Sequence, residues 1–339
     1  MRIFIPLLIA SAAVAIAVAL AAFGGAAGVL VVVLITAFVL YGRGVGLKTE
    51  ADSPWVAQTK AQERYFTIEG LRVRMIEAGQ GMPVLLLHGW ADSTFAWRKL
   101  IPRLQNTCRL IMIDWPGFGY SDKPERSLSY PQLAKVAKSV LDELGIDKAA
   151  VVGNSMGGAA AIQLAADFPE RVETLALIDA HAPLNPRKSP LALRLLLAPG
   201  LGETAAFLMG RTVYRFILWM IVVDRSVVTG EVVREVYLPV RTKGGRKAVL
   251  NQFREISLSP VSFETAAKVQ APTLILWGDT DRLMPLPSGK RMHKAMPGST
   301  FVVLPDTGHS GQWEKPDLVA LHLEPFIRQH HMESREVLL

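Results

Sequence analysis

The feature that most constrains the fold is the stretch 151–158, which reads Val-Val-Gly-Asn-Ser-Met-Gly-Gly. Ser155 is the centre of a Gly-x-Ser-x-Gly pattern, with an apolar, strand-like run before it (149–152) and a helix-like run after it (156–166). A strand that turns this sharply into a helix strains the serine backbone and leaves room only for glycine around it. The serine hydroxyl is then exposed at a helix N-terminus, where N–H groups favour developing negative charge. A nucleophile in acyl transfer needs this environment.

Beyond residue 64, strand patterns alternate with helix patterns. An alternation of apolar and polar residues on both sides of Gly70 predicts an antiparallel hairpin, and the later apolar runs predict strands buried on both faces. Strands that alternate with helices of about a dozen residues predict a parallel sheet covered on both faces. The predicted strands cover 65–69, 71–78, 84–87, 109–114, 149–152, 171–179, 272–278 and 300–304. The predicted helices cover 97–104, 130–144, 156–166, 287–296 and 316–330.

This alternation stops between about residues 182 and 267, where helix-like segments are separated by proline, glycine or charged residues. We interpret the region as a helical cap inserted into the sheet domain. Its predicted helices cover 191–198, 204–208, 214–223 and 227–237. The predicted organisation is a membrane segment (1–42), a linker (43–64), the first part of the core (65–181), the cap (182–267), the second part of the core (268–331) and a tail (332–339).

The N-terminal segment has no charged residue from position 3 to position 41. As one helix these about 39 residues would extend roughly 58 Å, almost twice the hydrocarbon core of a bilayer. The glycine-rich break at 24–28 therefore suggests a hairpin that crosses twice, with the flanking basic residues, and hence the catalytic domain, on the cytoplasmic side. A single anchor, or a cleaved signal peptide over about 1–22, is the alternative. The hairpin and the single anchor both predict localisation at a membrane.

The overall charge also favours a membrane partner. The net charge is +7, but the lysines and arginines are spread along the chain without a dense basic run or an RNA-binding motif. We therefore expect contact with anionic lipid and no binding to nucleic acid. Cys108 is the one cysteine of the sequence, which excludes an intrachain disulfide.

The glycine-rich pattern alone also fits a turn with an incidental serine. Interpreting Ser155 as a nucleophile therefore depends on finding a base and an acid elsewhere in the chain. A serine hydroxyl needs a base, and the base works best when an acid fixes its tautomer. Asp281 follows the buried run that ends in Trp-Gly-Asp-Thr, and His309 lies just beyond the last predicted strand. Loops after parallel strands meet at one edge of the sheet, so Ser155, Asp281 and His309 can come together there. Asp279 and Asp179, which also follow predicted strands, are alternative acids.

Five stretches in the same order resemble the motifs of α/β-hydrolases, and the resemblance covers about residues 65–330. They are His-Gly-Trp at 88–90, the Asp-Trp-Pro-Gly-Phe-Gly-Tyr-Ser loop at 114–121, Gly-Asn-Ser-Met-Gly-Gly at 153–158, Leu-Trp-Gly-Asp-Thr-Asp at 276–281 and Gly-His-Ser-Gly-Gln-Trp-Glu-Lys-Pro at 308–316. The resemblance implies a mostly parallel eight-stranded α/β sheet with helices on both faces and an inserted helical cap.

The resemblance also implies roles for individual residues. Ser155 is the expected nucleophile, His309 the base and Asp281 the acid that orients it, and the backbone N–H groups of Trp90 and Met156 form the oxyanion hole. No metal and no organic cofactor are expected.

We expect structural roles for His88 and His181. His88 supports its loop through hydrogen bonds, and His181 packs at the cap hinge. Serine in place of aspartate as nucleophile argues against dehalogenase or epoxide hydrolase chemistry.

The expected function is that of a membrane-anchored serine hydrolase that cleaves carboxylic esters with an apolar acyl group, acting on a small ester or a lipid. An N-terminal membrane segment is a layout that the chain shares with membrane-bound monoacylglycerol lipases. The Gly-Asn-Ser-Met-Gly-Gly stretch is also similar to that of meta-cleavage C–C bond hydrolases, which gives one alternative. A non-catalytic binding protein built on the same fold is another.

Overall fold

The computed structural model describes residues 54–183 and 197–336. The predicted membrane segment (1–42) and most of the predicted cap helix at 191–198 lie outside these ranges. Within the described part of the chain, none of the helices combines the length and the apolar character needed to cross a membrane.

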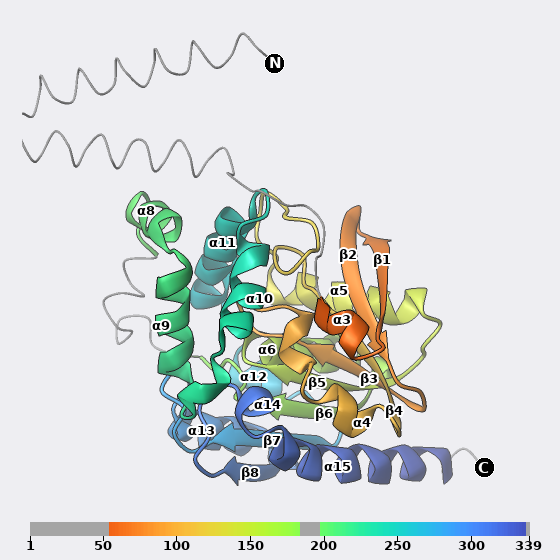
Figure 1. Ribbon diagram of the computed structural model, residues 1–339. Coiled ribbons are helices and arrows are strands. Elements are labelled where there is room, and N and C mark those ends of the chain that lie inside the picture. The colour runs from red at the N-terminus through yellow and green to blue at the C-terminus, as the bar shows by residue number, and fades with distance from the viewer. Residues whose placement is uncertain (1–53, 184–196, 337–339) are drawn as a thin grey trace, which may run out of the picture.

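A single sheet of eight strands forms the centre of the fold (Figure 1). Its strand order is β1-β2-β4-β3-β5-β6-β7-β8, with β1 and β2, and β2 and β4, antiparallel and all later pairs parallel. The predicted mostly parallel eight-stranded sheet is therefore confirmed. The strands are β1 (Gln62–Ile68), β2 (Leu71–Ala78), β3 (Met82–Leu87), β4 (Cys108–Ile113), β5 (Ala149–Asn154), β6 (Val172–Ile178), β7 (Thr273–Gly278) and β8 (Thr300–Leu304).

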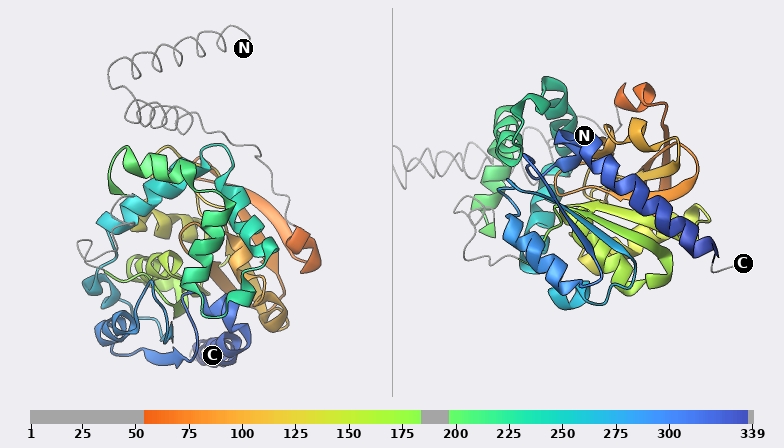
Figure 2. Two further views of the ribbon diagram at one scale, coloured as in Figure 1. Left: turned by 60° about the vertical axis from the view of Figure 1, so that its left-hand side comes forward. Right: turned by 90° about the horizontal axis from the view of Figure 1, so that it is seen from below.

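Helices cover both faces of this sheet (Figure 2). On one face α5 packs against α6, and α12 joins α6 to α13, while α15 and α4 pack together on the other. A capping interaction begins α5, since Gln132 Oε1 accepts the N–H of Ser129 (2.9 Å), and Gly145 with φ of +63° follows its end. These helices are α4 (Ile101–Leu104), α5 (Tyr130–Glu143), α6 (Met156–Asp167), α12 (Phe263–Ala266), α13 (Leu286–Ala295), α14 (Gly311–Glu314) and α15 (Pro316–Glu336), with 3-10 turns η1 (Thr94–Trp97) and η2 (Pro169–Arg171).

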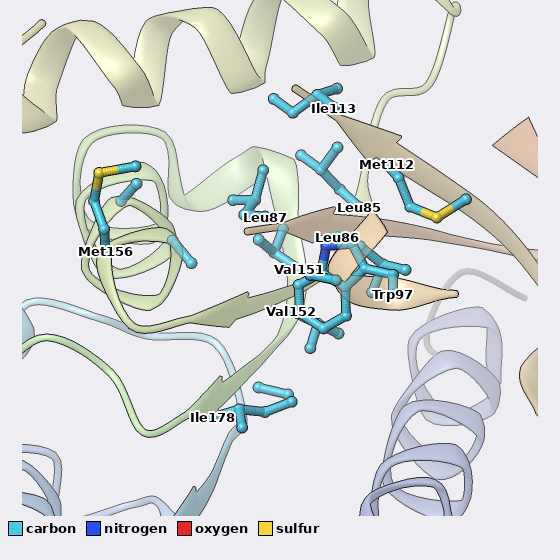
Figure 3. Close-up of a cluster of buried hydrophobic side chains, with 14 of the residues drawn as sticks. Leu85, Leu86, Leu87, Trp97, Met112, Ile113, Val151, Val152, Met156 and Ile178 are labelled. Atoms are coloured by element: carbon cyan, nitrogen blue, oxygen red, sulfur yellow. The ribbon is translucent and has the colours of Figure 1, made fainter. Parts of the chain in front are cut away.

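The central strands are apolar along their whole length because they have helices on both sides. Every residue of β5 and of β7 is buried. Figure 3 shows part of this core, with side chains of β3 and β5 beside Trp97, Ile178 below them and Met156 on the neighbouring helix α6. The site residues that follow these strands are therefore attached to fully buried elements of the core.

Between β6 and β7 the structure has helices that form the cap, grouped at the upper left in Figure 1. They lie within the range 182–267. The sequence patterns did not indicate α11, because its buried face includes a polar side chain. That residue is Gln252, whose amide bonds the N–H and the carbonyl of Leu128 in the core (3.0 and 2.7 Å). The described cap elements are α8 (Leu201–Leu208), α9 (Arg211–Ile221), η4 (Arg225–Val227), α10 (Gly230–Val240) and α11 (Gly245–Leu258).

Two predicted boundaries differ from the structure. Among the described residues, the last part of the predicted linker (43–64) is already regular structure, with α3 (Pro54–Gln58) and then the start of β1. The cause is Trp55, which is buried and meets the Phe95 ring edge to face at 5.9 Å. At the other end, α15 continues to Glu336, inside the predicted tail (332–339), and just before that tail His331 Nδ1 lies 2.9 Å from a Glu173 carboxylate oxygen.

Candidate active site

Ser155 occupies the turn between β5 and α6 in a strained conformation, with φ of 53° and ψ of −120°. Its N–H donates to the Ile178 carbonyl in the neighbouring strand (3.1 Å), which fixes the turn to the sheet. A Cβ atom at position 157 would collide with the Leu87 carbonyl, and one at position 153 would collide with residue 157 itself. Glycine is therefore required at both positions so that the serine can adopt this conformation.

The expected base and the expected acid are joined directly. His309 Nδ1 lies 2.7 Å from Asp281 Oδ2, and the other oxygen of Asp281 accepts the N–H groups of Leu283 and Met284 (2.7 and 2.9 Å). Because the carboxylate accepts at Nδ1, the neutral ring carries its proton there and leaves Nε2 free to receive one. Burial by itself lowers the pKa of His309, but the Asp281 carboxylate outweighs this effect, so the pKa is raised above its usual value.

Ser155 and His309 line the same cavity. Asn154 connects the two loops, because its Nδ2 donates to the carbonyls of Ile178 (3.0 Å) and His309 (3.2 Å). The structure, which describes both side chains, shows no hydrogen bond between the Ser155 hydroxyl and the His309 ring. In hydrolases this contact often shortens only when substrate binds.

The two alternative acids have other surroundings. Asp279 is exposed and accepts from the Thr280 hydroxyl (2.9 Å) and the Thr307 N–H (3.3 Å). Asp179 is fully buried, and one of its oxygens accepts the Gly278 N–H (2.8 Å) while the other has no hydrogen-bond partner. Burial, and next the nearby Asp281 charge, raise the pKa of Asp179 well above its usual value, which favours its protonated form.

The residues expected to form the oxyanion hole lie at the two loops beside Ser155. Met156 is the first residue of α6, and Trp90 follows β3 and lines the cavity. The Trp90 indole N–H donates to the Val249 carbonyl of α11 (2.8 Å), so this loop is bonded to the cap. A helix N-terminus supplies N–H groups suited to an oxyanion.

His88 acts as a structural support of that loop. The Trp115 N–H donates to His88 Nε2 (3.1 Å), so Nδ1 carries the proton and donates to the Gly89 carbonyl (2.7 Å). Burial lowers the pKa of His88 to about 4, which keeps the ring neutral.

The cavity has a volume of about 940 Å³ and extends from Ser155 under the cap. Most of its lining side chains are apolar. Its basic lining residues in the described part of the chain, Arg282 and Arg291, are exposed to solvent. The apolar side chains of the lining are Trp90, Ala91, Leu197, Met209, Ile217, Leu218, Ile221, Val236, Phe253, Ile256, Pro260, Leu283, Met284, Pro285, Pro287 and Trp313.

Two titratable side chains of the cavity were not predicted from the sequence as parts of the site. Burial raises the pKa of Asp92 to about 7, and its Oδ1 accepts the Ser93 N–H (2.8 Å). Burial, and next the charge of His309, lower the pKa of His181 to about 4, and its Nδ1 lies 3.1 Å from the Tyr130 hydroxyl. Both residues lie in loops that follow strands, and this position is the signal that the sequence offers for a site residue. Whether they face a cavity depends on the cap, whose placement the sequence does not give. Among the described residues, no group of three or more histidine, cysteine or acidic side chains could hold a metal ion.

Comparison with known proteins agrees with this geometry. The family model for the alpha/beta hydrolase fold matches residues 82–206 and 228–316. A 2-hydroxy-6-oxo-6-phenylhexa-2,4-dienoate hydrolase of Burkholderia cepacia is 31% identical over 267 residues, which cover 74% of this chain and 89% of that protein.

Solved structures show the same fold. A thermophilic esterase from Thermogutta terrifontis has a TM-score of 0.66 at 25% identity and covers 80% of this chain and 100% of its own. A bacterial membrane phospholipase A has a TM-score of 0.69 at 24% identity and covers 98% of this chain and 99% of its own. At that identity the second likeness shows the fold alone. The family match, together with the B. cepacia relative, shows that the chain belongs to the α/β-hydrolase fold family and is a hydrolase.

Proposed function

We propose that the protein is a serine hydrolase that cleaves carboxylic esters with an apolar acyl group. The observation that carries this proposal is that Ser155 and the Asp281-bonded His309 line one large, mostly apolar cavity. Its volume of about 940 Å³ lies near the upper end of the range for small-molecule sites. Each methylene buried in such a cavity contributes about 0.8 kcal/mol of binding.

In the proposed mechanism His309 takes the Ser155 proton at Nε2, and the serine oxygen attacks the ester carbonyl. The resulting oxyanion accepts hydrogen bonds from the N–H groups of Met156 and Trp90. In comparable enzymes each such bond stabilises the transition state by about 3 kcal/mol. Collapse expels the alcohol with the proton from His309 and leaves an acyl-enzyme. His309 then activates water, which hydrolyses the acyl-enzyme and frees Ser155. Asp281 stabilises the imidazolium of His309 in both acylation and deacylation.

The second candidate is hydrolysis of a C–C bond, since the B. cepacia relative at 31% identity is a dienoate hydrolase. A dienoate carries a carboxylate, which requires a cation or several N–H donors when it is buried. The basic lining residues in the described ranges are exposed at the cavity wall, and the titratable lining residue next to the Trp90 loop is acidic Asp92. This favours a neutral, apolar ester.

We further propose that the N-terminal segment holds the enzyme at a membrane. The support is the uncharged stretch 3–41, which in its hairpin form places the flanking basic residues and the catalytic domain on the cytoplasmic side. Accessibility of a cysteine introduced near Gly46 to a membrane-impermeant thiol reagent tests the side. Rapid labelling in intact cells would contradict the cytoplasmic placement.

Rates on p-nitrophenyl esters of increasing acyl length, beside those on a 2-hydroxy-6-oxo-dienoate, test the ester proposal. We expect kcat/KM to rise with acyl length until the cavity is filled and to exceed that for the dienoate. A higher kcat/KM for the dienoate would support the C–C bond candidate instead. Ser155→Ala is the control, and it should abolish turnover of both substrates.

A further inference from the structure

Helix α9 has an apolar stripe on its solvent-facing side. The stripe comprises Val213, Phe216, Met220 and, just past the helix end, Val223, with Phe216 59% exposed. Val213, Phe216 and Met220 are three and four residues apart, which places them on one face over about 10 Å of helix, and Val223 follows in the non-helical segment after it. Single exposed apolar residues are common, but a row of them on one helix face marks a contact surface.

The opposite face of α9 lines the catalytic cavity. Tyr214 and Leu218 are buried, and together with Ile217 and Ile221 they form part of the cavity wall. Figure 1 shows α9 at the outer edge of the cap, at the left of the molecule. One helix therefore separates the site from the surroundings of the protein, with apolar side chains on both of its faces.

The end of α9 is bonded to the loop of the proposed base. The His309 N–H donates to the Ile221 carbonyl (2.7 Å). Glu314 bridges the same two segments, since its Oε2 accepts the N–H groups of Val223 and Asp224 (2.6 and 3.3 Å) and its Oε1 accepts that of Gly308 (3.0 Å). A partner that binds to α9 would therefore contact a helix whose end is hydrogen-bonded to the loop of His309.

The charges on α9 complement an anionic surface. The helix carries Arg211 and Arg215 and no acidic residue. At 100° per residue both arginines project to another side of α9 than the stripe, as in amphipathic helices that place an apolar side in the interface of a membrane and attract anionic lipids with basic residues of the polar side. The same chain bears the uncharged N-terminal stretch 3–41, and its net charge is +7.

We propose that this stripe, which we call the α9 surface (Val213, Phe216, Met220 and Val223), docks on a lipid bilayer that contains anionic lipids. Docking brings the cavity wall to the lipid pool, a consequence that rests on the proposed ester hydrolysis. A second copy of the chain is the weaker occupant. Stable dimers bury roughly 800 Å² per partner, whereas the α9 surface is a single row of four side chains.

An environment-sensitive fluorophore on Phe216→Cys tests the docking itself. The full-length protein is reconstituted in phosphatidylcholine vesicles with and without phosphatidylglycerol, and quenching by a lipid-borne nitroxide is measured. The native Cys108 is fully buried and will not react with the reagent in the folded protein. The matched control is Leu321→Cys on α15, at a position that is 65% exposed and outside the cap.

We expect quenching at position 216 to be several-fold stronger than at position 321 and to increase with phosphatidylglycerol. Equal quenching at the two positions would overturn the proposal. So would a blue shift at position 216 that depends on protein concentration without quenching by lipid, because that result places a second copy on the α9 surface.

A kinetic test separates docking from catalysis. The double variant Phe216→Ser/Met220→Ser should hydrolyse a long-chain ester held in anionic vesicles about tenfold more slowly than wild type, a factor that corresponds to about 1.4 kcal/mol. Its rate on a short water-soluble ester should be unchanged, as should both rates of Leu321→Ser. Wild-type rates of the double variant on vesicles would refute docking. Inactivity of wild-type protein on both esters would refute the proposed function, while the quenching result would still decide the docking.

Discussion

At the residue scale, the His309 imidazole is held by one of two buried carboxyl groups near it. Asp281 has hydrogen-bond donors at both oxygens, and one of these donors is His309 Nδ1. Asp179 has one oxygen without a partner, and burial raises its pKa well above the usual value. Burial and the nearby Asp281 thus favour the protonated form of Asp179, and Asp281 is the carboxyl group that bonds and orients the ring.

The pH dependence of kcat/KM should reflect the raised pKa of His309. The base must be neutral, so activity is lost as the pH falls through a midpoint that lies above the ordinary value of about 6.5. Because the folded pKa exceeds the unfolded one, the same pair stabilises the fold at low pH, and this contribution is lost as the pH rises through the folded pKa. A midpoint below 6.5 for a short ester would contradict this assignment.

Asp281→Asn should lower kcat by about 10⁴-fold, the cost of the equivalent change in a well-studied serine hydrolase. It should also move the acid midpoint to lower pH, because burial, which lowers the pKa of His309, then acts without the carboxylate. Asp279→Asn, at an exposed position without a bond to His309, is the matched control and should leave kcat within about threefold. Equal losses in both variants would refute the role of Asp281.

At the scale of elements, short stretches of backbone hold the site together between the core and the cap. The β5 turn packs so closely on β3 that a side chain at position 157 would meet the Leu87 carbonyl. On the cap side, Glu314 binds the end of α9 to the loop of His309. Each contact acts on the position of a proposed catalytic group through backbone atoms, and neither Gly157 nor Glu314 takes part in the proposed chemistry.

Glu314→Gln should lower kcat on a short ester by between about ten- and a hundredfold, since a misplacement of about 1 Å has such an effect. Glutamine has the same size as glutamate. It has only one acceptor oxygen, however, whereas Glu314 accepts backbone N–H groups with both of its oxygens. The KM should change less, because the substrate does not touch this residue. The control is Glu264→Gln at an exposed position. A kcat unchanged from wild type would show that α9 and the His309 loop are not coupled through Glu314.

Gly157→Ala should destabilise the folded protein by about 2 kcal/mol or more, as expected when a Cβ is forced against buried backbone. Chemical denaturation checks this. The control is Gly298→Ala, because a Cβ at that position meets no atom within 4 Å. Similar unfolding midpoints for the two variants would contradict the packing that we describe around Ser155.

The sequence predicted the strands of the sheet and the positions of Ser155, Asp281 and His309, because apolar runs and glycine spacing are local signals. It did not indicate α11, whose buried Gln252 interrupts the apolar pattern. The roles of Asn154 and Glu314 were also missed, since both depend on backbone groups more than 80 residues away. Contacts of this kind appear only when the tertiary structure is known.

At the scale of the whole molecule, the proposed membrane attachment and the α9 surface address the same question of how an apolar ester reaches a buried serine. The cavity under the cap is large and mostly apolar, and α9 forms one of its walls. The described fold begins with α3 at Pro54, after the uncharged stretch 3–41. The predicted membrane segment therefore precedes the first described element of the catalytic domain.

Deletion of residues 2–42 should release the protein from the membrane fraction and leave the hydrolysis of a short soluble ester within about threefold of wild type. Hydrolysis of a vesicle-bound ester should fall further, because α9 would have to find the bilayer unaided. Carbonate extraction followed by immunoblotting measures the release. Full retention in the membrane pellet would show that this segment is not the anchor.

We propose that His309, oriented by Asp281, makes the Ser155 hydroxyl reactive. Fluorophosphonate labelling of the folded wild-type protein, with the modified residue located by peptide mass spectrometry, is the decisive measurement. We expect one modified residue, Ser155, with no label in Ser155→Ala and much slower labelling in His309→Ala. If folded wild-type protein takes no label, or takes it at another residue, the proposed mechanism is wrong.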